Sequence, residues 1–268
     1  MSQWFSARRL WLTATLSKAI ATRRKEDVSA LLQRKLNSKF SGNAATEYGL
    51  RHEEEAINDY VTMMQSEDPT ISVCRWGLVV SVADPWLACS PDAIILRSAC
   101  TEPEHVLLEV KCLQRCQAAS LADVASQKGS GFCLELVDGH FHLKLSHEYY
   151  YQVQLNLLVT DLQLAMLLVQ TPQEMFVQPI NRNEDLLSNI LPRLRVFYFE
   201  HLLPALYTEL VNVNTTSSPL PGSSADSLLT SSSAAPLESD TIASHLLPEH
   251  LSQSTATGAL HAHSLPCM

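Results

Sequence analysis

The stretch SPDAIILRSACTEPEHVLLEVKC, residues 90–112, decides the fold. Its two aliphatic runs, AIIL and HVLLEVKC, are separated by a polar segment with a proline, which predicts two strands joined by a turn. Side chains alternate between the faces of a strand, so Glu109 and Lys111 share one face. If the strands form a hairpin, Asp92 at the start of the first one comes alongside Glu109.

Two carboxylates beside a lysine can hold a metal, although the Glu109–Lys111 pair alone is more often a plain ion pair. Carboxylates that converge repel each other unless a cation lies between them. The chain offers no convincing set of His and Cys ligands, so oxygen ligands favour Mg²⁺, with Mn²⁺ as the alternative. The backbone carbonyl of Val110 would complete such a site.

Upstream of this stretch, residues 43–65 predict a helix that begins at Asn43 or Thr46. Glu53 is the first of three consecutive glutamates on that helix, and it shares a face with apolar residues three and seven positions later. We therefore expect Glu53 to point inward as a third acid, whereas Glu54 and Glu55 fit a solvated face. The helix residues expected in the core are Ala56, Ile57, Tyr60 and Val61.

Downstream, the pattern continues to mix strands and helices. Residues 132–145, FCLELVDGHFHLKL, predict a hairpin that turns at Asp138-Gly139. Residues 149–160, YYYQVQLNLLVT, predict a helix with Gln152 and Asn156 on one face, and residues 162–170 predict a buried strand. Residues 1–40 read as helical, and residues 184–211 as a terminal helix or pair, bent or broken near Pro192 and Pro204.

Composition bounds the domain organisation. The 268 residues are 46% hydrophobic, which is enough to bury a core, and the order of elements indicates one α/β domain over residues 1–212. Residues 213–268 are rich in Ser, Thr and Pro, contain no Lys or Arg, and are expected to be a disordered tail. The seven cysteines form no CxxC pair, and neither a membrane span nor a secretion signal is present. An intracellular location, nuclear or cytoplasmic, fits best.

Charge is distributed unevenly along the chain. The net charge of −9 argues against a nucleic-acid partner at first, but residues 1–40 hold nine Lys and Arg against two acids. This basic segment is as well explained by a solvated helix face as by contact with nucleic acid.

Taken together, these motifs resemble the YqaJ, or phage lambda-type exonuclease, branch of the PD-(D/E)XK nuclease superfamily. The matching strings are the GLRHE ending at Glu53, ACSPDA around Asp92, LEVKC around Glu109 and the YYYQVQ that begins at Tyr149. The N-terminal pattern of Trp4, Arg8 and a TAT ending at Thr15 also matches. Ala93, Leu113 and Thr15 depart from the family's glycine, proline and serine, and none of these changes removes an expected metal ligand.

The resemblance implies a restriction-endonuclease-like core, with a central mixed β-sheet flanked by helices. It also implies a Mg²⁺-dependent 5′-to-3′ exonuclease that acts on double-stranded DNA ends with a 5′-phosphate, in recombination or repair, and a homo-oligomer. The implied catalytic residues are Glu53, Asp92, Glu109, Lys111 and Gln152; the metal ligands Asp92, Glu109, Val110 and Glu53; and the substrate-binding residues Arg8, Thr15, Tyr149 and Gln154. The alternatives are a catalytically silent DNA-binding module of the same fold and an unrelated α/β domain.

Overall fold

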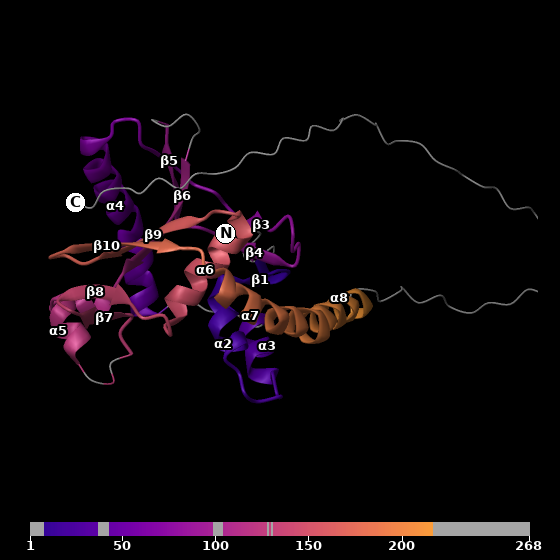
Figure 1. The fold of residues 1–268 in the computed structure, drawn as a ribbon. Helices are drawn as coiled ribbons and strands as arrows, with labels where there is room; N and C mark the ends of the chain where they lie inside the picture. The colour runs from indigo at the N-terminus through magenta and orange to yellow at the C-terminus, as the bar shows by residue number, and fades with distance from the viewer. Residues whose placement is uncertain (1–7, 37–42, 99–103, 128, 130, 217–268) are drawn as a thin grey trace, which may run out of the picture. The chain divides into compact units, whose positions relative to one another are not determined.

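The centre of the molecule is a mixed five-stranded sheet (Figure 1). The computed structural model describes residues 8–36, 43–98, 104–127, 129 and 131–216. The strand order is β10-β9-β6-β5-β2, in which β6 and β9 are parallel and the other neighbours antiparallel. The strands are β2 (Ser72–Cys74), β5 (Ala93–Arg97), β6 (Glu104–Cys112), β9 (Leu164–Gln170) and β10 (Met175–Asn181). The predicted α/β class with a mixed central sheet is confirmed, and β10 is an additional strand.

Helices cover the two faces of this sheet. Helix α4 (Ala44–Glu67) packs against Leu108 and Val110 of β6 through Ile57 and Tyr60. Helix α6 (Glu148–Thr160) packs on the opposite face, where Val153 and Leu157 join a cluster with the other side of β6 and β9. The alternation of side chains along β6 is the reason for this layering, because it sends Glu109 and Lys111 to the α6 side.

The N-terminal region differs from the predicted continuous helix. Within residues 8–36 the structure has β1 (Leu12–Thr13), η1 (Ala14–Leu16), α2 (Ser17–Ala21) and α3 (Ser29–Leu36). Strand β1 lies parallel to β4 (Leu87–Cys89), which also pairs with β3 (Val79–Val80). Pairing with β4 interrupts the helical periodicity.

A hairpin and two short helical segments lie between β6 and α6. Strands β7 (Leu134–Val137) and β8 (His140–Leu143) meet at Asp138 and Gly139, both with positive φ, as predicted. The other two segments are η2 (Gln114–Cys116) and α5 (Leu121–Ser126).

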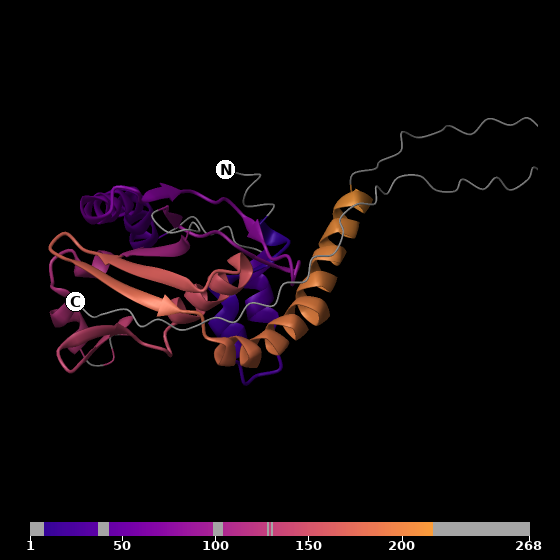
Figure 2. The same cartoon turned by 45° about the horizontal axis from the view of Figure 1, so that its top comes forward.

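The C-terminal helix is one bent run rather than a broken pair (Figure 2). Helix α7 (Glu184–Val196) contains Pro192 and leads through a π-helical segment, η3 (Phe197–Leu202), into α8 (Leu203–Thr216). Pro204 has no backbone N–H, so it cannot donate a hydrogen bond to the preceding turn of the helix. The π-helical segment lies directly before it.

Helix α8 continues past residue 212, the expected end of the domain. Residues 217–268, most of the expected disordered tail, lie outside the described residues. Among the described helices, none combines the length and apolar character that a membrane span requires.

Candidate active site

The β5–β6 pairing brings Asp92 to Glu109, as the hairpin argument predicts. Ala93 pairs with Leu108, so Asp92, one residue before β5, lies level with Glu109. The Oδ2 atom of Asp92 accepts a hydrogen bond of 2.7 Å from the backbone N–H of Val110. This bond ties the start of one strand to the centre of the other and fixes the carboxylate at the sheet surface.

Glu109 and Lys111 form a buried ion pair on the α6 side of β6. The Lys111 Nζ and Glu109 Oε1 atoms lie 2.5 Å apart, and the Glu109 side chain is fully buried while that of Lys111 is 15% exposed. The ammonium group lies 5.0 Å from the centre of the Tyr149 ring on α6, which is within range of a cation–π contact. Tyr149, expected in substrate binding, is therefore beside the expected catalytic lysine.

Asn156 contacts this pair and was not among the predicted site residues. Its Nδ2 atom donates a 3.0 Å hydrogen bond to Oε2 of Glu109, and the residue is 1% exposed. Its place on the α6 face of Gln152 was visible in the sequence, but a single asparagine in a helix carries no signal of the strand residue that it meets.

Glu53 reaches the site from α4. Its side chain is partly exposed, and its Oε1 lies 3.8 Å from Nη1 of Arg75. Arg75 also donates to Glu54 and to the backbone carbonyl of Asp92, so it links α4 to the segment that carries Asp92. Sequence reasoning did not single out Arg75, because a single arginine beside a strand carries no signal of the carboxylate and the carbonyl that it meets. Glu54 and Glu55 are exposed, as expected.

Burial and the charge of Asp92 raise the pKa of the two neighbouring glutamates. Burial, together with the negative charge of Asp92, raises the pKa of Glu53 to about 6, partly offset by Lys111 and Arg75. Burial and Asp92 also raise the pKa of Glu109 above its ordinary value. Burial acts to lower the pKa of Lys111, but the charges of Glu109 and Asp92 outweigh it and leave this pKa raised. Lys111 is therefore an ammonium ion at neutral pH.

The donor set fits a hard divalent cation in its chemistry. Asp92 and Glu109 present oxygen atoms, and their repulsion is what a cation would relieve. Within the described ranges, however, no three His, Cys, Asp or Glu side chains are close enough to form a metal cluster by themselves. Backbone, water or substrate oxygens would have to complete the coordination.

A cleft of 860 Å³ opens beside Lys111 and Glu53. It runs from the start of α4 across the end of β6 to η2 and the start of α6, and its polar lining includes Arg115 and Tyr149. Asn43 accepts a hydrogen bond of 2.9 Å from the backbone N–H of Thr46, so the N-cap of α4 is Asn43, at the rim of this cleft.

Residues 3–163 match the YqaJ-like viral recombinase domain. The chain belongs to this family. No curated protein matches it.

Two solved structures, of LHK-Exo alone and with dAMP, share the fold of this YqaJ-like domain. The alkaline exonuclease LHK-Exo from Laribacter hongkongensis is 18% identical, with a TM-score of 0.54, over 81% of this chain and all of the other. The complex of LHK-Exo with dAMP gives a TM-score of 0.53 at the same identity and coverage. A phage-related exonuclease from Haemophilus somnus is 13% identical over 77% of this chain and 99% of the other, with a TM-score of 0.49.

The other predicted residues of the YqaJ-like domain lie at different distances from this centre. Arg8 is half-buried, and this burial lowers its pKa. The charges of Cys89, Glu109 and Asp92 act in the opposite direction, so Arg8 is within electrostatic reach of the two acids. Thr15 is exposed on η1. Gln152 is half-buried on α6 and makes no side-chain hydrogen bond within the described part of the chain.

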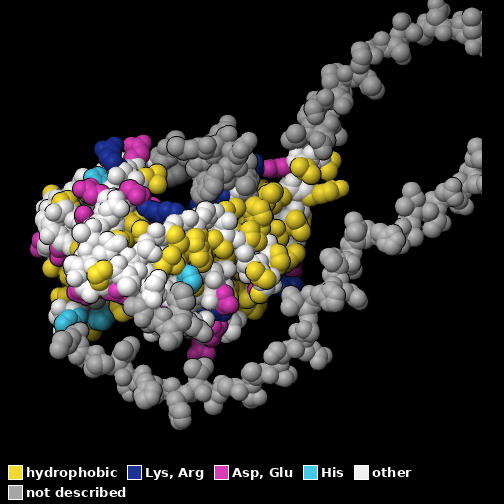
Figure 3. All heavy atoms as spheres, turned by 90° about the horizontal axis from the view of Figure 1, so that it is seen from above, with side chains coloured by type: hydrophobic (Ala, Val, Ile, Leu, Met, Phe, Trp, Pro, Cys, Tyr) yellow, Lys and Arg dark blue, Asp and Glu magenta, His cyan; other side chains and the backbone are white. Residues whose placement is uncertain are grey.

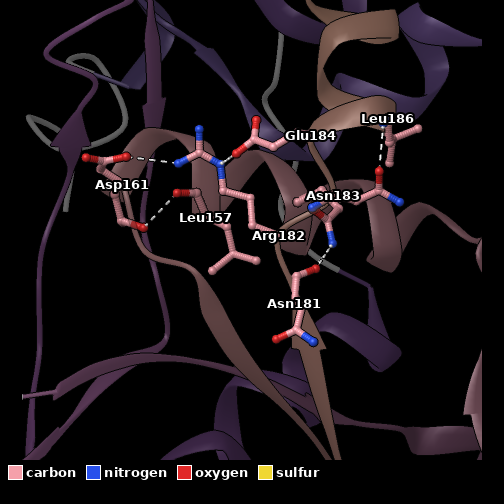
Figure 4. Close-up of polar contacts among 9 residues, drawn as sticks. Leu157, Asp161, Asn181, Arg182, Asn183, Glu184 and Leu186 are labelled. Carbon is pink, nitrogen blue, oxygen red and sulfur yellow. Dashed lines mark hydrogen bonds and ion pairs between the residues drawn. The ribbon is translucent and has the colours of Figure 1, made fainter. Parts of the chain in front are cut away.

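Gln154 is not brought to the site. Its side chain is fully buried, donates to the carbonyl of Asn181 and accepts from the N–H of Asn183. These bonds attach α6 to the β10–α7 connection, where Arg182 pairs with Asp161 and Glu184 (Figure 4). Both ends of the Gln154 amide are occupied, so the geometry assigns it to the packing of this junction and not to substrate.

Proposed function

We propose that this chain is a metal-dependent DNA exonuclease that hydrolyses phosphodiester bonds at duplex ends. The observation that carries the proposal is the Asp92–Val110 hydrogen bond beside the buried Glu109–Lys111 pair, which gathers two acids and an ammonium ion. Lys111 and Val110 also line the cleft. The structures of similar fold are of exonucleases, and one of them holds dAMP. These likenesses support a DNA substrate.

Each side chain has a part in the proposed reaction. Asp92, Glu109 and the Val110 carbonyl would hold a Mg²⁺ or Mn²⁺ ion, with Glu53 near a second ion or its water. When bound, such an ion lowers the pKa of a water molecule and offsets charge on phosphate. Lys111, charged at neutral pH, would stabilise the negative charge that develops on the phosphoryl oxygens rather than accept a proton. Gln152, with a free amide, would orient the water or a phosphate.

Substrate contacts would follow the cleft. Arg115 and Tyr149 line it beside Lys111, and Arg8 is close enough to Glu109 and Asp92 for their charges to act on its pKa. Arg8 and Thr15 would receive a 5′-phosphate, which would give 5′-to-3′ polarity. Contacts of this kind are made with the backbone, so we expect little dependence on base sequence.

The test is a cleavage assay with the full chain, Mg²⁺ and labelled duplex DNA. We expect Asp92→Asn and Lys111→Ala to reduce the rate at least ~100-fold, the order found when one group that stabilises transition-state charge is removed. Glu55→Gln, an exposed change on α4, should retain the wild-type rate. Equal rates for wild type and both variants would refute the catalytic proposal.

The same assay addresses polarity and the silent-module alternative. Wild type should degrade ends with a 5′-phosphate faster than ends with a 5′-hydroxyl, and Arg8→Gln should remove that difference. Binding of duplex ends without cleavage at any Mg²⁺ concentration would favour a DNA-binding module of the same fold.

A further inference from the structure

One face of α6 contacts both members of the Glu109–Lys111 pair. Tyr149 and Asn156 are seven residues apart, two turns of helix or ~10.5 Å. Glu109 and Lys111 are two residues apart on β6, or ~7 Å along the strand. The Tyr149 ring lies by the ammonium group of Lys111, and the Asn156 amide lies by the carboxylate of Glu109. The helix therefore contacts the pair at both ends.

The carboxylate of Glu109 depends on these protein donors. It is fully buried, so water cannot solvate it, and a buried carboxylate needs hydrogen bonds from the protein. Lys111 donates to Oε1 at 2.5 Å, and Asn156 donates to Oε2 at 3.0 Å. With one donor on each oxygen, the plane of the carboxylate is fixed.

Asn156 also stands out from its neighbours on α6. Of the buried residues around it, Val153, Leu155, Leu157 and Val159 are apolar, and Gln154 bonds to the β10–α7 connection. A buried amide among them is unfavourable unless it is hydrogen-bonded, and its described partner is Glu109. The packing of the helix alone would be served as well by leucine.

We propose that Asn156 is a positioning residue for the hydrolytic reaction: it holds the Glu109 carboxylate in the orientation that faces Asp92 and the divalent cation. This inference rests on the proposed function. Asn156 acts through Glu109 and does not itself reach the substrate. Without its amide, Glu109 would keep its charge partner Lys111 but would be free to rotate about its terminal bond.

The test compares Asn156→Leu with Thr171→Val in the full chain. Thr171 is also buried and hydrogen-bonded, but its hydroxyl serves the β9–β10 turn. Both variants should lose stability towards urea. Only Asn156→Leu should lower kcat, by ~10- to 100-fold as for other residues that orient metal ligands, while its KM for duplex DNA stays within about twofold of wild type. Calorimetry with Mn²⁺ should show affinity loss for this variant alone.

The outcomes separate the inference from the function. A folded Asn156→Leu with wild-type kcat and Mn²⁺ affinity would overturn the positioning role, and so would equal losses in Thr171→Val. If Asn156→Leu does not fold, Asn156→Asp keeps the shape and replaces the donor by oxygen, and the same losses are expected. A wild type that binds Mn²⁺ but cleaves no DNA would overturn the proposed function. In that case the Mn²⁺ affinity of Asn156→Leu would still show whether Asn156 positions Glu109.

Discussion

At the scale of single residues, the proximity of the candidate site residues could be predicted, and the residues that hold them in place could not. Asp92, Glu109 and Lys111 are adjacent in sequence to strand runs, so alternation and a hairpin place them together. Asn156 and Arg75 join the site only through tertiary packing of α6 and of the segment after β2. Gln154 belongs to the same short string as Gln152 but points to the other side of α6, because the two are two residues apart on a helix.

Lys35 gives a prediction about pH at this scale. Burial, together with the charges of Arg8 and Arg9, lowers its pKa to about 8 from 10.5, although its Nζ donates to the carbonyl of Arg8 at 3.0 Å. Between pH 8 and 10.5 the unfolded chain binds more protons at this site than the folded chain does. Stability should therefore rise with pH across that window, and the full penalty of the buried charge applies below it.

The check is urea unfolding at pH 7.5 and pH 10 for wild type and Lys35→Met. The pKa difference corresponds to about 3 kcal/mol of pH-dependent stability as an upper value. Wild type should gain stability relative to Lys35→Met as pH rises. Parallel changes in the two proteins would show that Lys35 is not buried as a charge.

At the scale of elements, local patterns predicted most helices and strands. The α4 helix, the β7–β8 hairpin, α6 and β9 follow from capping, turn and periodicity rules, and each was found. The prediction of an N-terminal helix was wrong. Strand β1 is only two residues long and forms through its pairing with β4, which no local pattern reveals. Strand β4 was missed for the same reason, because it has three residues and lies between β1 and β3. The edge strand β10 has seven residues but contains Pro179, which argues locally against a strand.

The C-terminal helix provides a matched pair of leucines. Leu202 is fully buried at the end of η3, whereas Leu210 on α8 is 64% exposed. Exposed apolar side chains gather along this helix, where the yellow band runs towards its end in Figure 3. Leu202→Ala should cost 2–5 kcal/mol by order of magnitude, about the cost of a core cavity.

Leu210→Ala should change the free energy of unfolding by less than about 0.5 kcal/mol. Chemical unfolding of the two variants provides the comparison. A large loss in Leu210→Ala would mean that the outer face of α8 is covered in solution.

The hairpin offers a second prediction at this scale. Gly139 has φ of 81° and Asp138 has φ of 50°, as in a tight turn with two left-handed residues. Gly139→Ala should destabilise by about 1 kcal/mol because alanine is strained there, while Asp138→Asn should be neutral. Thermal unfolding measures both, and an unchanged midpoint for Gly139→Ala would contradict this turn geometry.

At the scale of the whole molecule, the sheet and α4 bring negatively charged side chains close together. Burial and then the charge of Asp92, at the start of β5, raise the pKa of Glu53 on α4 and of Glu109 on β6, and the charge of Lys111 partly offsets both rises. The fold and its family could be predicted from four ordered motifs, since these fix which strands carry the acids. The full set of ligands of a cation could not be predicted. It depends on oxygen atoms of the backbone, water or substrate, which the motifs do not contain.

The most direct measurement is the release of nucleotides from duplex DNA by the full chain as Mg²⁺ is titrated, then removed with a chelator and restored in excess. We expect the release to rise with Mg²⁺, to stop with the chelator and to resume when Mg²⁺ is restored. Release that continues in the chelator, or none at any Mg²⁺ concentration, would contradict this expectation.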